Sequence, residues 1–185
     1  MQKITMLALI TACATILTAP AAHAEERTCR GSLGRITVDN LRVPDGATCT
    51  LNGTTVKGTI KVESRATLVA DSVRVVGNVQ AENAKKVVVR NGSRVGGSVQ
   101  IVQGGIGRVV RTNVQGDILY DDQGGKVAAI RSTVGGNIQA FQNTGGVGIR
   151  GNRVDGNLQC KENHPAPVGG NNIVDGSKED QCSRL

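Results

Sequence analysis

Apolar and polar residues alternate around a glycine that recurs about every twenty residues along most of the chain. Valine stands two residues before this glycine in every copy, and Ile, Val or Leu stands two residues after it in all copies but the last. The glycines are Gly58, Gly77, Gly97, Gly116, Gly136, Gly156 and Gly176. A period of two is typical of a β-strand with one buried face. The fixed spacing of the copies indicates a repeat architecture.

A second apolar run follows most of these glycines, for example at 87–89 and 127–130, and glycine pairs often lie between the runs. Short strands and tight turns fill each repeat and leave no room for a helix. We therefore predict an all-β, single-stranded parallel β-helix of six to seven coils of about 20 residues. The usual crossover preference favours the right-handed form. The recurring glycine is expected to mark a bend.

A β-sandwich with evenly spaced strands is the alternative fold. A sandwich core normally uses aromatic residues, whereas this chain has one Tyr, one Phe and no Trp. Narrow coils filled by aliphatic side chains fit this composition better.

The chain divides into four segments. Residues 1–24 resemble a secretory signal, with Lys3 at the start, an apolar run and a small-residue cleavage site at 22–24. Residues 25–55 are expected to form an N-terminal cap, 56–160 the repeats, and 161–185 a C-terminal cap and tail. We therefore expect an exported protein, periplasmic or secreted, without a transmembrane span. The alternative is a lipid anchor at Cys13, because residues 10–13 resemble a lipobox.

Four cysteines follow the signal: Cys29, Cys49, Cys160 and Cys182. An even number of cysteines in an exported chain indicates disulfide bonds. The spacing favours pairing Cys29 with Cys49 and Cys160 with Cys182, one bond at each end of the solenoid. The close cysteine pairs of a zinc site are missing from the sequence.

The segment after residue 24 carries a net charge of +6, because Lys3 is the one charged residue before it. An excess of positive charge in an exported protein favours anionic polymers such as lipopolysaccharide, wall polymers or DNA. Specific nucleic-acid binding is not expected, because aromatic stacking platforms are scarce. One arginine follows the second apolar run in four successive repeats: Arg90, Arg111, Arg131 and Arg150. These four predict an anion-binding stripe if their registers agree, and ordinary solvated side chains otherwise.

Catalytic candidates are few. Asp117, Asp121 and Asp122, together with Arg111, are the best constellation for a polysaccharide-active lyase or hydrolase, although the pair at 121–122 also fits a solvated turn. His164, the one histidine after the signal, has no second histidine for a metal site and no nucleophile motif. The sequence predicts no cofactor, no metal ligand and no catalytic residue.

The repeated Val-x-Gly-Asn-Ile/Leu-Gln, together with Cys160 and Cys182 near the end, resembles small exported bacterial β-helix proteins of uncharacterised function. It is also loosely similar to bactofilins, β-helical proteins that polymerise end to end. Bactofilins lack a signal peptide and terminal disulfides, and no functional residue carries over. The sequence thus predicts a non-enzymatic structural or binding protein, either secreted or in the cell envelope, that presents a rigid β-helix surface. A polysaccharide-active enzyme is the alternative. The sequence does not specify an oligomeric state.

Overall fold

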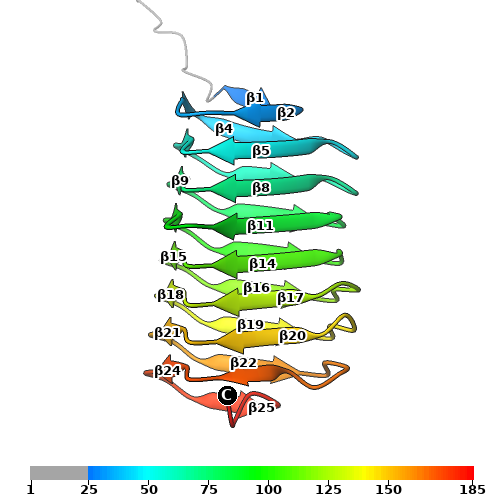
Figure 1. Cartoon of the computed structure of the whole chain (residues 1–185), viewed down its shortest axis with the longest axis vertical. Helices are drawn as coiled ribbons and strands as arrows, with labels where there is room; N and C mark the ends of the chain where they lie inside the picture. Colours follow the sequence, from blue (N-terminus) through cyan, green and yellow to red (C-terminus); the bar gives the residue numbers. More distant parts are fainter. Residues whose placement is uncertain (1–24) are drawn as a thin grey trace, which may run out of the picture.

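The computed structural model describes residues 25–185 as a parallel β-helix of about eight coils with no helix (Figure 1). The expected signal segment and the alternative lipid anchor at Cys13 lie outside the described residues. Each coil contributes one strand to each of three parallel sheets, here named A, B and C in the order in which the chain enters them. The fold class predicted from the sequence is therefore confirmed.

The strands of each sheet succeed one another coil by coil. Sheet A consists of β1 (Glu26–Thr28), β4 (Asn40–Val43), β7 (Ile60–Val62), β10 (Val79–Glu82), β13 (Val99–Val102), β16 (Ile118–Asp121), β19 (Ile138–Phe141), β22 (Leu158–Lys161) and β25 (Lys178–Asp180). Sheet B consists of β2 (Gly31–Leu33), β5 (Thr48–Asn52), β8 (Thr67–Asp71), β11 (Lys86–Arg90), β14 (Ile106–Val110), β17 (Val127–Ile130), β20 (Val147–Arg150) and β23 (Val168–Gly170). Sheet C consists of β3 (Thr37–Val38), β6 (Thr55–Val56), β9 (Arg74–Val75), β12 (Arg94–Val95), β15 (Asn113–Val114), β18 (Thr133–Val134), β21 (Arg153–Val154) and β24 (Ile173–Val174).

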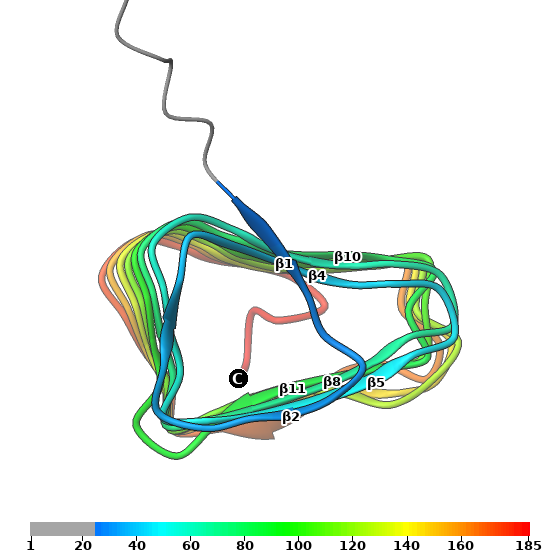
Figure 2. The same ribbon diagram turned by 90° about the horizontal axis from the view of Figure 1, so that it is seen from above.

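The three sheets enclose a three-sided interior, and the turns between them form the A–B, B–C and C–A corners (Figure 2). Seen from the N-terminal end in Figure 2, the chain runs clockwise as it recedes, so the helix is right-handed, as the crossover preference favours. The coil count exceeds the predicted six to seven. Residues 25–55, expected to be a cap, already contain β1 to β5 and coil like the rest.

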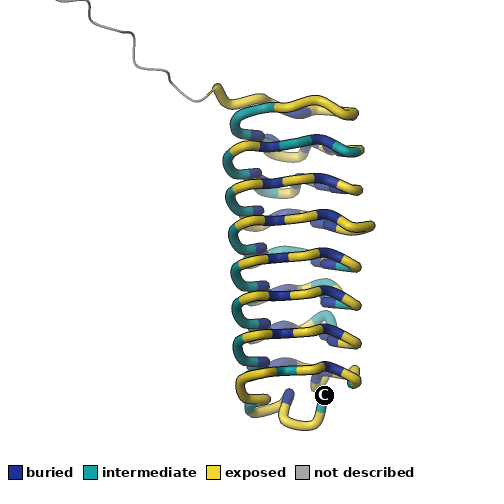
Figure 3. The backbone as a smooth tube through the Cα atoms, turned by 90° about the vertical axis from the view of Figure 1, so that its left-hand side faces the viewer, coloured by how far each residue is buried: buried dark blue, intermediate teal, exposed yellow. Residues whose placement is uncertain are grey.

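The interior is built from columns of aliphatic side chains that face inward at alternate strand positions. One such column in sheet A is fully buried along its length and consists of Leu41, Ile60, Val79, Val99, Ile118, Ile138 and Leu158. A fully buried side chain of this size contributes about 1.5–3 kcal/mol relative to an exposed one. The same pattern of burial returns in coil after coil (Figure 3). Repetition of one inward-facing set is what holds the coils in register.

The recurring glycine lies at the C–A corner, where the chain bends between sheet C and sheet A, as expected. In every coil but the last, the residue after this glycine has a side-chain oxygen that accepts a hydrogen bond from a backbone N–H of the following coil. Asn78 Oδ1 accepts from Ser98 N at 2.8 Å, and Ser98 Oγ accepts from Asp117 N at 3.0 Å. A Cβ atom on Gly97 would collide with Asn78 Oδ1. Glycine is therefore required at this bend because the polar ladder occupies the space of a side chain.

The two other corners carry buried polar ladders of the same kind. At the A–B corner, Asn143 Oδ1 accepts from Gln123 N at 3.1 Å, and Asn163 Oδ1 accepts from Asn143 N at 3.1 Å. At the B–C corner, Asn152 Oδ1 accepts a 3.0 Å hydrogen bond from Ser132 N. These ladders satisfy backbone groups that the corners would otherwise leave buried and unpaired.

Disulfide bonds join Cys29 to Cys49 and Cys160 to Cys182, the pairing that the spacing favoured. Each bond links neighbouring coils near one end of the helix. Leu185 packs against the core, and the chain ends beneath the last coil (Figure 2). Both ends of the core are thus tied down.

Candidate functional site

The four arginines of the predicted stripe lie at or next to the B–C corner on four consecutive coils. Arg90 and Arg150 are the last residues of β11 and β20, whereas Arg111 and Arg131 are the first residues of the turns after β14 and β17. Backbone hydrogen bonds connect this region from coil to coil, for example from Arg131 N to Arg150 O at 3.0 Å. The registers differ by one residue, so the four side chains follow one corner but not one column. All four are exposed.

The four charges are not equivalent. Arg90 Nε lies 2.8 Å from Asp71 Oδ2 and forms an ion pair with it. Burial raises the pKa of Asp71, but hydrogen bonds from Asn91, Ser72 and Arg90, with the Arg90 charge, outweigh it and hold the pKa below its usual value. Arg111 donates a 3.0 Å hydrogen bond to the neutral Asn91 Oδ1. Within residues 25–185, Arg111, Arg131 and Arg150 have no carboxylate within ion-pair distance.

Arg111 and Arg131 adopt φ angles of 49° and 51°, in the left-handed region. A non-glycine residue there costs about 1–2 kcal/mol, and Gly, Asn and Asp tolerate the region best. The corresponding turn residues in neighbouring coils include Asn91, Gly151 and Asn171. Backbone preference therefore does not account for arginine at these two positions, which leaves the charge as the property to explain.

Two further arginines extend the basic surface onto sheet C. Arg74 and Arg94 occupy equivalent positions in β9 and β12 and are paired in register. Both are exposed, and neither forms an ion pair within the described residues. They line a shallow depression of about 380 Å³ with Val76 and Gln115. Like charges facing each other in a sheet are unfavourable, so an anion bound between them would stabilise the pair. Alignment of the residue three positions before each repeat glycine would have revealed this pair.

Negative charge is absent from sheet B over most of its length. The residue ranges 84–93, 103–112, 123–132, 143–152 and 163–172, which hold sheet B from β11 to β23 and its bordering turns, contain no Asp or Glu. Most carboxylates of the middle coils instead belong to sheet A or its turns: Glu82, Asp117, Asp121 and Asp122. An anionic ligand is therefore attracted to the B–C side and repelled from sheet A.

The structure separates the residues of the catalytic hypothesis. Asp117 Oδ1 is a rung of the C–A ladder and accepts hydrogen bonds from Asn137 N at 2.7 Å and Asn137 Nδ2 at 3.0 Å. Asp121 ends β16 and Asp122 begins the A–B corner, whereas Arg111 lies at the B–C corner, at the other end of sheet B. The expected constellation of these aspartates with Arg111 is therefore not formed.

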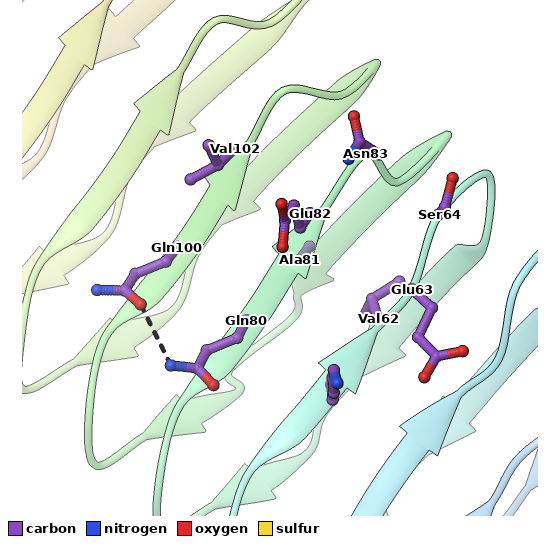
Figure 4. Close-up of a pocket in the computed structure, with 10 residues that line it drawn as sticks. Val62, Glu63, Ser64, Gln80, Ala81, Glu82, Asn83, Gln100 and Val102 are labelled. Atoms are coloured by element: carbon purple, nitrogen blue, oxygen red, sulfur yellow. Dashed lines mark hydrogen bonds between the residues drawn. The ribbon is translucent and has the colours of Figure 1, made fainter.

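Sheet A carries a groove of about 690 Å³ on its outer face, lined by Lys61, Glu63, Gln80, Glu82 and Gln100 among others (Figure 4). Part of its floor is an amide ladder, in which Gln80 Nε2 donates to Gln100 Oε1 at 3.4 Å (Figure 4). The Glu63 carboxylate is engaged by Arg42 at 3.4 Å and by the backbone N–H of Asp45 at 3.2 Å. These contacts give Glu63 a structural role beside the groove.

His164 is exposed in the loop after β22. Among residues 25–185 no group of three or more His, Cys, Asp or Glu side chains is placed to hold a metal ion. In the same part of the chain, no helix is long and apolar enough to cross a membrane.

Comparison of the chain with protein-family models, with curated proteins and with solved structures finds no match. The chemistry of the described surfaces is therefore the guide to function.

Proposed function

We propose that this chain is an exported, non-enzymatic binding protein that holds a linear anionic polymer of the cell envelope along the B–C corner. One observation carries the proposal: four consecutive coils each present an arginine at this corner, and three of these have no carboxylate partner within the described residues. Coils follow one another at about 4.8 Å. An extended polymer with regularly spaced acidic groups can contact several of these charges at once.

The chemistry of the neighbouring surfaces supports a polysaccharide or wall polymer over nucleic acid. Single-stranded nucleic acids gain much of their affinity from stacking on aromatic side chains. Tyr120 is fully buried, and Phe141 lies on sheet A, away from the arginines. Two disulfide bonds are compatible with an oxidising compartment, where anionic envelope polymers occur.

The test is binding of polygalacturonate, a linear polyuronate, across a series of salt concentrations. The affinity should fall steeply between about 50 and 200 mM salt, because binding releases condensed counterions. Replacing Arg111, Arg131 and Arg150 together by Gln should weaken binding at least tenfold and reduce the slope of log K against log salt by about 2. Arg90→Gln alone should have the smallest effect of the four single changes, because Asp71 already offsets its charge.

A matched control removes similar positive charge from other surfaces, by replacing Lys61, Lys161 and Lys178 of sheet A with Gln. This control should retain most of the affinity. Equal losses in the two triple variants, or binding that does not respond to salt, would refute the corner site. The polymer is also sized after incubation with calcium and without it. Cleavage that disappears in Asp121→Ala/Asp122→Ala would support the enzymatic alternative instead.

A further inference from the structure

A separate depression lies on the outer face of sheet B, towards the C-terminal end. It has a volume of about 470 Å³ and is bordered by β14, β17, β20, β23 and the loop before β23. Its lining is largely apolar and includes Ile106, Ala128, Gly148, Pro165 and Val168. None of the arginines of the B–C corner contributes to it.

The depression results from the sizes of side chains in one column of sheet B. Arg108, Ala128, Gly148 and Val168 occupy successive rungs of this column, in register. The two middle rungs have small side chains or none, so the surface sinks between Arg108 and Val168. The loop at 164–167 adds a wall, because Pro165 lies over Gly146. The result is a trough and not a flat sheet surface.

Apolar side chains remain exposed around this trough. Ile106 is 39% exposed and Val168 is 69% exposed. A ligand that covers them removes apolar surface from water, which is the main favourable term in most binding. The volume falls within the range of small-molecule sites, about 300–1,000 Å³.

Two cations mark one end of the trough. Arg108 and Lys126 both line it and both are exposed. Neither has a carboxylate within ion-pair distance among residues 25–185. The nearby strands and turns of sheet B lack acidic residues altogether, as described above. The site therefore combines an apolar trough with uncompensated positive charge.

We propose that this trough binds a single-chain anionic amphiphile, an alkyl chain that ends in a carboxylate, sulfate or phosphate. The chain lies over Ala128 and Gly148, between Pro165 and Val168, and the head group contacts Arg108 and Lys126. Charge complementarity selects this class of ligand. A neutral apolar ligand would bury the rim of the trough and leave both cations without a partner, which is costly.

The same charges argue against a second copy of this chain as the occupant. A two-fold contact places the same patch on both partners, so each partner would bring Arg108 and Lys126 to the interface and neither would bring a carboxylate. A bilayer is also a poorer fit, because a walled trough encloses one chain whereas a membrane surface is best met by projecting apolar side chains. This proposal is independent of polymer binding at the B–C corner, since it uses different residues.

The experiment measures binding of monomeric decyl phosphate by isothermal titration calorimetry, below the concentration at which micelles form. Octyl phosphate, inorganic phosphate and decyl maltoside are the comparison probes. We expect one site for decyl phosphate and at least tenfold weaker binding of inorganic phosphate and of the uncharged maltoside. Each buried methylene changes affinity about fourfold at most, so octyl phosphate should bind about tenfold more weakly.

Gly148→Leu is designed to fill the trough without disturbing the fold. A Cβ atom at Gly148 would have its nearest neighbours at 3.9 Å, an ordinary contact distance. This variant should lose binding at least tenfold while its thermal unfolding is unchanged. Arg108→Gln/Lys126→Gln should lose discrimination between decyl phosphate and decyl maltoside. Gly34→Leu is the matched control, because Gly34 lies near the N-terminal end, far from the trough, and a Cβ atom there would have open space around it. This variant should bind decyl phosphate as the original protein does.

Three results would overturn the proposal. The first is binding that survives Gly148→Leu, and the second is affinity independent of alkyl length. The third is binding to anionic vesicles or to a second copy of the protein, detected by flotation or sedimentation, without binding of the monomeric amphiphile. If the original protein binds decyl phosphate but does not bind polygalacturonate, only the polymer proposal is rejected.

Discussion

Tyr120 is the chain's single tyrosine, and it lies fully buried in a column otherwise occupied by smaller side chains. Its hydroxyl donates a 2.8 Å hydrogen bond to Ala128 O. The facing column provides room at Gly107, where a Cβ atom would lie 3.0 Å from Tyr120 Cε1. Val87 and Val127 occupy the adjacent rungs of that column. The large ring and the missing side chain therefore compensate each other across two adjacent coils.

Burial raises the pKa of Tyr120 above its ordinary value. An unfolded tyrosine ionises near pH 10, so above that pH the folded state holds a proton that the unfolded state has lost. Stability is therefore fully present below about pH 10 and decreases as the pH rises above it. Absorbance at the tyrosinate band should remain unchanged until the protein unfolds, and should then appear in a single step with the loss of circular dichroism.

Tyr120→Phe provides the comparison, because it removes the ionisable group and keeps the ring. Its stability should decline less steeply at alkaline pH, although one hydrogen bond to Ala128 is lost at a cost of about 1 kcal/mol. Gradual ionisation of Tyr120 in the folded protein would contradict its burial.

At the scale of elements, the corners distinguish this helix from a simple stack of strands. Asn152 illustrates the arrangement: its Oδ1 accepts from Ser132 N, and its Nδ2 donates to Ala129 O at 2.8 Å and to Asn172 Oδ1 at 2.9 Å. One buried amide thus connects three coils. Buried polar groups contribute stability when every partner is satisfied and become costly when one is removed.

Asn152→Ala should lower the free energy of unfolding by about 3 kcal/mol, because it leaves several buried groups without partners. Asn152→Ser should cost clearly less, since Ser132 fills the same corner position one coil earlier and accepts a backbone hydrogen bond there. Urea denaturation of the two variants beside the original protein measures both costs. Equal destabilisation by Ala and Ser would mean that the side chain acts by filling space and not through the ladder.

Periodicity in the sequence was sufficient for the strands, the parallel stacking and the bend at the recurring glycine. It undercounted the coils at the N-terminal end, because residues 25–55 contain no copy of the recurring glycine that marks each repeat. It also gave no indication that Gln123 and Asn143, at the A–B corner, are fully buried. The preceding residues, Asp122 and Gln142, have φ angles of 52° and 53°. This left-handed step turns the next side chain inward, and a pattern of polar residues alone does not reveal it.

An amide ladder on the outer face of sheet A forms in two separate parts. Gln139 Nε2 donates to Gln159 Oε1 at 2.9 Å, in addition to the pair at Gln80 and Gln100. Leu119 lies between the two parts in the same column and interrupts the ladder.

The position of the arginines followed from their spacing after the second apolar run, but the ion pair of Arg90 with Asp71 did not. That pair depends on which residues of adjacent coils face each other.

At the scale of the molecule, each strand pairs with strands of adjacent coils and with no others among the described residues. Stability in such a solenoid is approximately a sum over neighbouring coils, so the ends are the weakest places. A rigid stack also fixes the spacing of the corner arginines, which suits a ligand with regular charges. The two disulfide bonds lie where fraying would otherwise begin.

Replacing Cys160 and Cys182 by Ala tests this local view of stability. A disulfide that closes a loop of this size contributes about 3 kcal/mol in the chain-entropy model. We expect the loss to appear at the C-terminal end, where Asp175 N donates to Val154 O and Gln181 N donates to Cys160 O. Hydrogen exchange of these amides should become at least tenfold faster. The amide of Ile118, in the middle of the helix, should retain its protection.

Replacing Cys29 and Cys49 by Ala is the corresponding experiment at the N-terminal end. This disulfide closes a loop of similar length to the one that Cys160 and Cys182 close. Amides of the first coils should then exchange faster, including that of Thr55, which donates to Ile36 O. Those near Asp175 should not change. If either pair of substitutions instead accelerates exchange equally along the whole chain, the coils unfold as one cooperative unit. Stability would then not be a sum over neighbours, and each disulfide would stabilise the basic corner as much as its own end.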